Sequence, residues 1–406
     1  MLETLYAFLD SSRDQIVLWQ RSLTARPALG PENGGEGERQ KADWLHQELT
    51  ALGLSDIRSY PCPDHRVPCG FRPNISARVQ GKGGPTLWVI SHLDVVPPGD
   101  NALWTHPPFE LHVLADHVYG RGVEDNHQGI VSSLLAARAL LNCGITPDIS
   151  LGLLFVADEE TGMSHGLPYV LGADPHLIAP DDLCLVPDMG NATGSMVEIV
   201  EKSVLWLRFT VLGAQSHASR PSDGVNSLVA ASACILALDA LHRTFNEQDL
   251  RFLPAGSTFV PSKKEANVEN INTLPGKDVF YMDCRVVPGY PLERILEETR
   301  RIAETVARQY GARIEVDPVH AVQAPPATPD NAPVVRRLLS ALAELRGIAG
   351  ELRGSGGLTE ANCLRACGRQ AVAWATLEGN AHSGDESSSI LATVADAKVI
   401  ARMLFS

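Results

Sequence analysis

The spacing of hydrophobic residues in the first 200 positions predicts alternating helices and strands. From Asp10 to Leu54 apolar residues recur at helical spacing on both sides of the proline- and glycine-rich stretch ARPALGPENGGEGE. Three short apolar or β-branched runs follow, ISARVQ, TLWVISHLD and ISLGLLFVADEE, and the helical stretch GIVSSLLAARALLN separates the last two. This order predicts an α/β core whose buried strands are largely parallel.

The pattern changes near Glu201. An alternating strand, SVLWLRFTVLGAQSHAS, precedes the helix NSLVAASACILALDALHRTF, the strand KDVFYMDCRVVP, the helix PLERILEETRRIAETVARQYG and the strand ARIEVDPV. This order predicts a compact α+β insert of about 120 residues. After AVQAPPATPDNAP, the helix VVRRLLSALAELRG and the strand QAVAWATL resume the first pattern. We therefore expect one domain from residues 1–200 and 321–406, interrupted by a second domain at 201–320.

Composition narrows the classes of partner. The 406 residues are 44% hydrophobic and 20% charged, as in globular proteins. The net charge of −14 is dispersed and no block of lysine and arginine occurs, which argues against nucleic acid and against anionic membrane surfaces. The first residues, MLETLYAFLDSSRDQ, lack the basic start of a signal peptide, and the eight cysteines lack the spacing of a disulfide scaffold. We expect a cytoplasmic protein.

Acidic and histidine-bearing segments stand where the predicted strands end. They are SHLDVV, GVEDNHQG, FVADEETG, VPDMG and EGNAHSG. In an open α/β sheet, ligands bind beyond the carboxyl ends of the strands, so these segments can converge on one site. His92 and Asp94 would share a strand face, as in a metal ligand oriented by a carboxylate, although a surface turn would explain the pair equally well.

Two acidic segments also have simpler interpretations. Asp125 precedes a helix and could be its N-cap. Asp158, Glu159 and Glu160 are adjacent, and three neighbouring carboxylates repel one another strongly unless a cation is present, but a solvated loop tip would also disperse that charge.

Taken together, the segments contain the donor set of a two-metal hydrolase with a general base. The residues concerned are His92, Asp125, Glu159, Glu160, Asp188 and His382.

At this point the sequence resembles the M20 metallopeptidases and deacylases, the group that includes acetylornithine deacetylase, succinyl-diaminopimelate desuccinylase, aminoacylase and glutamate carboxypeptidase. The motifs are SHLDVVP, GRGVEDN, DEETG, PDMG, SHASRP, NINTLPG, SGGLTEA and AHSGDE. The resemblance implies a phosphorylase/hydrolase-like, mixed-sheet catalytic domain that binds metal at 1–200 and 321–406. It also implies that residues 201–320 form a ferredoxin-like α+β domain, which serves as lid and in dimerisation.

Carried over residue by residue, the resemblance implies roles for the polar groups. Asp125 would bridge two divalent ions, His92 and Asp188 would complete one site, and Glu160 and His382 the other. In the same way, Glu159 would be the general base, Asp94 would orient His92, and His217 would stabilise the oxyanion across a homodimer interface. A cis peptide between Asp125 and Asn126 is implied too. Zn²⁺ suits this set, with Co²⁺ or Mn²⁺ as alternatives.

Substrate recognition is assigned to four further residues. Asn272 and Arg285 match insert positions that face the substrate in relatives, but Arg285 could equally pair with Asp283 two residues away. In SGGLTEA, Gly357 and Thr359, next to Gly356, could hold a substrate carboxylate through amides and a hydroxyl, and a plain turn is the alternative.

Three functions follow from this interpretation. The first is hydrolysis of an N-acyl amino acid, and the second is dipeptidase or aminopeptidase action on short peptides. Asp188 favours the second, because many deacylase relatives have Glu there. The third is a non-catalytic binding protein on the same fold, which would lack a ligand or the base. All six positions are filled, and we expect a metal-dependent amidohydrolase that acts on a small molecule or a short peptide.

Overall fold

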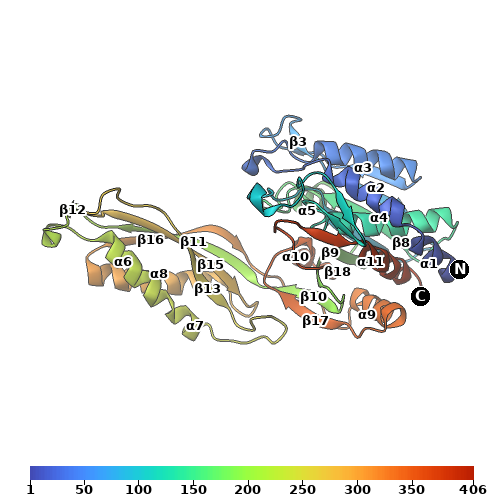
Figure 1. Ribbon diagram of the computed structural model, residues 1–406. Coiled ribbons are helices and arrows are strands. Elements are labelled where there is room, and N and C mark those ends of the chain that lie inside the picture. The colour runs from blue at the N-terminus through green and yellow to red at the C-terminus, as the bar shows by residue number, and fades with distance from the viewer. The chain divides into compact units, whose positions relative to one another are not determined.

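The computed structural model describes all 406 residues, Met1–Ser406. The chain divides into two compact units, which are described separately. Unit 1 contains Met1–Ile199, Ala327–Arg353 and Thr359–Ser406, and unit 2 contains Val200–Pro326 and Gly354–Leu358. Both are drawn in Figure 1.

Unit 1 is built on an eight-stranded mixed sheet. The strand order is β1-β4-β8-β5-β9-β18-β10-β17. The bounds are β1 Ser55–Ser59, β4 Ile75–Val79, β5 Thr86–His92, β8 Ser150–Val156, β9 Leu183–Asn191, β10 Met196–Glu201, β17 Glu351–Ser355 and β18 Ala371–Thr376. The neighbours β8, β5, β9 and β18 are parallel, so their carboxyl ends meet at one edge.

Not every pair in this sheet is parallel. The strands β1, β4 and β10 pair antiparallel. The expectation of largely parallel strands therefore holds for the four that carry the site but not for the run ISARVQ, which forms β4. Every residue of β5 and β8 is buried, which explains why both runs read as continuously apolar.

Helices cover the sheet of unit 1. They are α1 Leu2–Asp10, α2 Arg13–Thr24, α3 Arg39–Ala51, α4 His127–Asn142, α5 Leu167–Ala173, α9 Pro333–Arg346, α10 Glu360–Ala366 and α11 Ile390–Met403. α4 packs on β5, β8 and β9 and also contacts α11, α2 and α1. α5 and α10 pack together over a core that includes Trp88, Ile90 and Val186. The apolar helix α11 was not anticipated from the sequence.

Short elements complete this unit. β6 His112–Leu114, β7 His117–Tyr119 and β19 Ser387–Ser389 form a small sheet, β2 Cys62–Pro63 pairs with β3 Phe71–Arg72, and two 3₁₀ turns span Pro31–Asn33 and Asn101–Leu103.

Unit 2 is an α+β structure with one antiparallel sheet, β13-β15-β11-β16. The bounds are β11 Ser203–Leu212, β13 Thr258–Lys264, β15 Lys277–Val286, β16 Arg313–Val322, α6 Ser227–Leu238, α7 Ala240–Thr244 and α8 Leu292–Tyr310. A short antiparallel pair, β12 Ser216–His217 with β14 Thr273–Leu274, and a 3₁₀ turn at Pro221–Asp223 complete it. Figure 1 shows α6 and α8 side by side along the sheet, where they also contact each other.

Alternation along β15 explains the two faces of this sheet. Phe280, Met282 and Cys284 are buried, while Asp283 and Arg285 between them are only half-buried. The Phe280 ring stacks on Phe209 of β11 with centroids 4.4 Å apart, a cross-strand aromatic pair.

The segment Ser227–Thr244 is long and apolar enough to cross a membrane by length and composition alone, but a core helix of a soluble protein also meets this test.

The borders of unit 2 differ slightly from the expected 201–320. The second border lies after Pro326 because the segment beyond β16 remains bonded to the insert: Gln323 Nε2 and the Ala324 amide both donate to Ser203 Oγ at 2.9 Å. The short segment Gly354–Leu358, which contains the predicted Gly357, also belongs to unit 2.

Close packing at the centre of the sheet yields a first prediction. A Cβ added to Gly152 on β8 would lie 2.4 Å from Trp88 Cε3, so Gly152→Ala must displace the buried indole. We expect the free energy of unfolding to fall by about 1–3 kcal/mol, measured by urea denaturation. Gly172→Ala is the control, because this helical glycine has open space around it and alanine favours helix by about 0.5–1 kcal/mol. Equal stability of the two variants would contradict this account.

Candidate metal centre

The predicted metal ligands meet at the carboxyl edge of the four parallel strands. His92 ends β5, Glu159 and Glu160 follow β8, and His382 lies in the loop after β18. Asp188 lies within β9 rather than after it. Asp125 precedes α4, and Asn126, not Asp125, is the residue at the N-cap position. The peptide between these two residues is cis, as the resemblance implied.

Asp125 lies between two histidines. Its Oδ1 is 2.7 Å from Nε2 of His92, and its Oδ2 is 3.1 Å from Nε2 of His382. Each histidine has a second carboxylate nearby: Asp188 Oδ1 is 3.7 Å from His92 Nε2, and Glu160 Oε1 is 3.2 Å from His382 Nε2. The two oxygens of one carboxylate therefore face two separate clusters of donors.

The donor atoms are close enough to share cations. Those of His92, Asp125 and Glu160 lie within 4.8 Å of one another, and so do those of His92, Glu159 and Asp188. These are the nitrogen and oxygen donors that zinc and similar divalent ions take in proteins. The residues present therefore fit a dinuclear centre.

Electrostatics also favours a cation here. Burial, followed by the charge of Asp125, raises the pKa of Glu160 to about 7, and burial raises the pKa of Asp188 and that of Glu159 as well. Hydrogen bonds that His382 donates to Asp125 and Glu160 raise the pKa of His382 to about 10. Buried carboxylates this close together repel one another, and a bound cation would compensate their charge.

Asp94 lies beside His92 and also binds the loop after β8. Its carboxylate accepts the backbone amides of Glu159 at 3.1 Å and Glu160 at 3.0 Å. The nearest acceptor to His92 Nδ1 is the backbone carbonyl of Asp94, at 3.0 Å, while the carboxylate lies at 3.6 Å. Asp94 thus ties the end of β5 to the loop after β8 and fixes the orientation of His92 mainly through its main chain.

Two polar residues of the site were not identified from the sequence. Asn126 Nδ2 donates to Asp188 Oδ1 at 2.7 Å and so fixes the direction of that carboxylate. Glu360 is the first residue of α10 and is buried. Burial raises its pKa to about 8; the charge of His92 lowers this pKa and that of Asp188 raises it. Glu360 lies inside the motif SGGLTEA, so an acidic residue within a recognised motif was the sequence feature that could have identified it.

The predicted substrate residues occupy varied environments. Thr359 is buried and accepts the Ala361 amide at 3.2 Å as the N-cap of α10. In unit 2, Arg285 pairs with both carboxylate oxygens of Asp283, at 2.8 and 3.0 Å, and also donates to the Gly356 carbonyl at 2.9 Å. The alternative pairing considered for Arg285 is therefore present.

The remaining predicted residues of unit 2 lie on the short pair β12–β14. His217 is exposed, its Nδ1 is 2.7 Å from Ser219 Oγ, and it pairs in register with Thr273. Asn272 is exposed beside it, and its carbonyl accepts the Ala218 amide.

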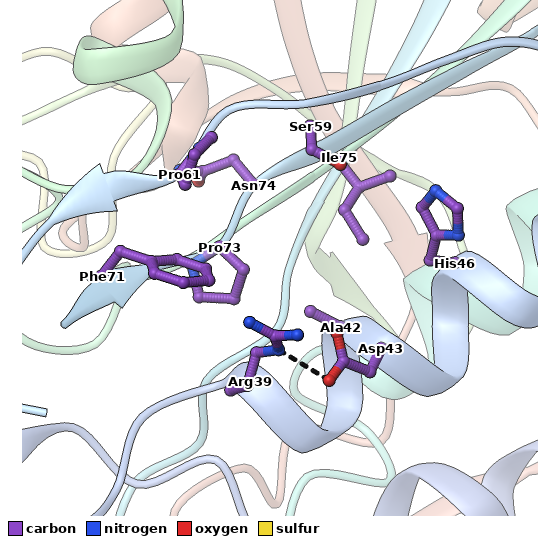
Figure 2. A pocket seen from close by; sticks show the side chains of 10 residues that line it. All are labelled: Arg39, Ala42, Asp43, His46, Ser59, Pro61, Phe71, Pro73, Asn74 and Ile75. Carbon is purple, nitrogen blue, oxygen red and sulfur yellow. Dashed lines mark hydrogen bonds and ion pairs between the residues drawn. The ribbon is translucent and has the colours of Figure 1, made fainter. Parts of the chain in front are cut away.

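A separate hollow of about 180 Å³ lies elsewhere in unit 1. Figure 2 shows the rings of Phe71 and Pro73 on one wall and the Arg39–Asp43 ion pair, 2.6 Å long, on α3. None of the ten residues that line it is a predicted site residue. This hollow is therefore distinct from the metal centre.

Comparison with known proteins agrees with this geometry. The profile of peptidase family M20/M25/M40 matches residues 88–406. The chain belongs to this family. An uncharacterized metallohydrolase of Methanocaldococcus jannaschii is 35% identical over 405 residues, which covers 96% of this chain and 99% of the relative. A succinyl-diaminopimelate desuccinylase of Alkalilimnicola ehrlichii is 28% identical and covers 90% of this chain and 92% of its own length.

Solved structures of M20 proteins share the fold. A di-peptidase from Saccharomyces cerevisiae aligns with a TM-score of 0.76 at 15% identity, covering 100% of this chain and 98% of that chain. The resemblance to the M20 family and the α/β fold are therefore confirmed. With its cluster of metal-binding residues, the M20 chain is a metal-dependent amide hydrolase.

The position of Asp125 leads to a prediction on metal content. Asp125→Ala removes the carboxylate that faces both histidines, so we expect the variant to retain neither ion after dialysis. Metal content per chain, measured by plasma emission spectrometry, should be two ions in the parent protein. Asp43→Asn, which removes an exposed carboxylate of the separate hollow, should retain both. A variant at Asp125 that still holds two ions would refute the bridging role.

Proposed function

We propose that this M20 enzyme hydrolyses the amide bond of a small N-acyl amino acid in a site that holds two divalent ions. The observation that carries the proposal is the arrangement around Asp125, whose two carboxylate oxygens face His92 and His382. Asp188 accompanies the first histidine and Glu160 the second. Asp125 would thus bridge the two ions, each completed by one histidine and one carboxylate.

Zn²⁺ suits these ligands, and Co²⁺ or Mn²⁺ are alternatives. Bound divalent ions lower the pKa of water and polarise the substrate carbonyl.

Glu159 is the proposed general base. Its backbone amide is fixed by Asp94 at 3.1 Å, and its carboxylate shares one cluster of donor atoms with His92 and Asp188. Burial raises the pKa of Glu159, which suits a group that accepts a proton from the attacking water and returns it to the leaving amine. The side chain stands beside the proposed ligands without being needed to complete either set.

The substrate assignment rests on the relatives. Full-length relatives at 28% and 26% identity are succinyl-diaminopimelate desuccinylases, enzymes whose name denotes removal of an acyl group from an amine. Arg285 would recognise the substrate carboxylate through its planar fork. Action on short peptides is the alternative, favoured by Asp188.

We further propose that the enzyme is a cytoplasmic homodimer. Helix α6 exposes Val229 and Leu236, with 47% and 78% of their surface accessible, and a partner subunit would cover these apolar side chains. His217 is exposed on the β12–β14 pair, where a second subunit could receive it.

The substrate proposal is tested with a base variant. Glu159→Gln removes the base but no proposed ligand, so metal content should stay at the parent level while turnover falls by about 10²–10⁴-fold. The assay compares N-acetyl and N-succinyl amino acids with free dipeptides, using chelator-stripped protein reloaded with Zn²⁺, Co²⁺ or Mn²⁺. Glu48→Gln, on the distant helix α3, is the matched control. Hydrolysis of free dipeptides alone would reject the deacylase assignment, and full activity of Glu159→Gln would reject the base.

Catalysis across the dimer is tested by complementation. Chains with His217→Ala and chains with Glu159→Ala should each be inactive. After unfolding and refolding of an equal mixture, half of the dimers are mixed, and each mixed dimer holds one site with both groups intact. Activity should then recover to about a quarter of the parent value, as two-fold symmetry requires. Confirmed mixed dimers without activity would show that His217 does not act in the neighbouring subunit.

A further inference from the structure

Two loops supply Asp125 and His382, and two buried carboxylates that bind no predicted metal join them. The first is Glu124, which has 2% of its surface exposed. Its oxygens accept four consecutive backbone amides of the loop before His382. The donors are Glu378, Gly379 at 3.1 Å, Asn380 at 2.9 Å and Ala381 at 3.0 Å.

The second carboxylate makes the reverse connection. Glu386, fully buried on the His382 side, accepts the amides of Gly122 and Glu124 at 2.9 Å and that of Asp125 at 3.1 Å. Arg121 forms an ion pair with the Glu386 carboxylate, with Nη1 at 2.5 Å from Oε2. Each loop thus contributes one carboxylate that gathers the main-chain amides of the other.

These bonds fix the backbone on both sides of Asp125 and His382. His382 has a φ of 64°, in the left-handed region that non-glycine residues occupy only when their surroundings impose it. One carboxylate accepts all four amides, so the loop cannot shift by one amide without losing several bonds at once. The carboxylates therefore define where the His382 ring stands relative to Asp125.

We propose that Glu124 and Glu386 are a pair of positioning residues, a reciprocal carboxylate clamp that sets the separation of Asp125 and His382 and thereby the affinity of the metal centre. This inference rests on the ligand assignment of the proposed function. Groups that orient metal ligands from behind contribute about 10–100-fold in affinity.

The two carboxylates act on different ligands, which makes the clamp distinguishable from general stabilisation. Glu124 holds the loop before His382, which serves only one of the two ions. Glu386 holds the amide of Asp125, which serves both. Loss of Glu124 should weaken one equivalent of metal, and loss of Glu386 should weaken two.

The test is a metal titration of the full chain with Co²⁺, which is followed by its visible absorption and by calorimetry against a competing chelator. In Glu124→Gln one carboxylate oxygen becomes an amide nitrogen, which cannot accept hydrogen bonds from the backbone amides. One equivalent of metal should therefore bind at least about tenfold more weakly, while the other keeps the parent affinity. The absorption assigned to that equivalent should also change shape. Glu386→Gln should weaken both equivalents.

Asp182→Asn is the matched control. This buried carboxylate accepts the Thr86 amide at 2.6 Å, the Ala179 amide at 2.8 Å and the Trp88 indole at 3.0 Å, near the start of β5 rather than its end. Its loss should lower the melting temperature yet leave both metal affinities unchanged. If Glu124→Gln does not fold, Glu124→Asp gives the same comparison, since it keeps the charge but is one methylene too short to reach all four amides.

Parent affinity for both equivalents in a folded Glu124 variant would overturn the clamp, as would equal weakening in Asp182→Asn. These outcomes differ from failure of the proposed function. If the parent protein bound two ions but cleaved none of the N-acyl amino acids, the substrate proposal would fall while the titration still tested the clamp.

Discussion

The carboxylate of Asp125, with one oxygen toward His92 and the other toward His382, is the interaction around which unit 1 is organised. Negative charge is concentrated here, because Glu160 belongs to one cluster of donor atoms with Asp125 and His92, and Glu159 and Asp188 belong to a second cluster with His92. Two like charges 4 Å apart repel by about 4 kcal/mol at the effective dielectric of a protein surface. Such a cluster persists only where surrounding groups fix it and where cations or protons compensate it.

Buried basic side chains behind the site hold this cluster of carboxylates in place. Arg72 is fully buried, pairs with Glu38 and lies 3.5 Å from Asp158, the residue that precedes the proposed base. Lys41, also buried, donates to the Leu93 carbonyl at 2.7 Å, between His92 and Asp94. Arg72 offsets part of the charge of the carboxylates, whereas burial lowers the pKa of Lys41 to about 7, and both side chains hold the ends of β5 and β8. Removal of one partner from a buried ion pair is strongly destabilising. A change in the charged groups behind the site would therefore also lower the stability of unit 1.

Sequence patterns predicted what depends on periodicity and on chemically distinctive residues. The continuous apolar runs of β5 and β8 gave the central strands, and the acidic residues at their ends gave the position of the site. The patterns missed α11, because most of its residues are buried and it lacks a clear polar face. They also missed the antiparallel direction of β4. Direction of pairing is set by contacts between distant residues, which periodicity does not record. Glu124 and Glu386 were missed for the same reason, since their partners are main-chain amides without a sequence signature.

If the substrate carries a carboxylate, as proposed, the cations of this chain that would bind it already have partners. The cations nearest the proposed ligands in unit 1, Lys41, Arg72 and Arg121, are buried and already bound to carboxylates or main-chain oxygens. Arg285 in unit 2 is likewise engaged, with Asp283 on one side and the Gly356 carbonyl on the other. Binding an anion there requires Arg285 to exchange Asp283 for the substrate, a replacement of one carboxylate by another. Because the Arg285–Asp283 pair is bidentate, a substrate carboxylate would have to compete with a stronger interaction than an ordinary exposed ion pair. Affinity for a carboxylate at Arg285 would therefore be limited by competition with the partners that this side chain already has.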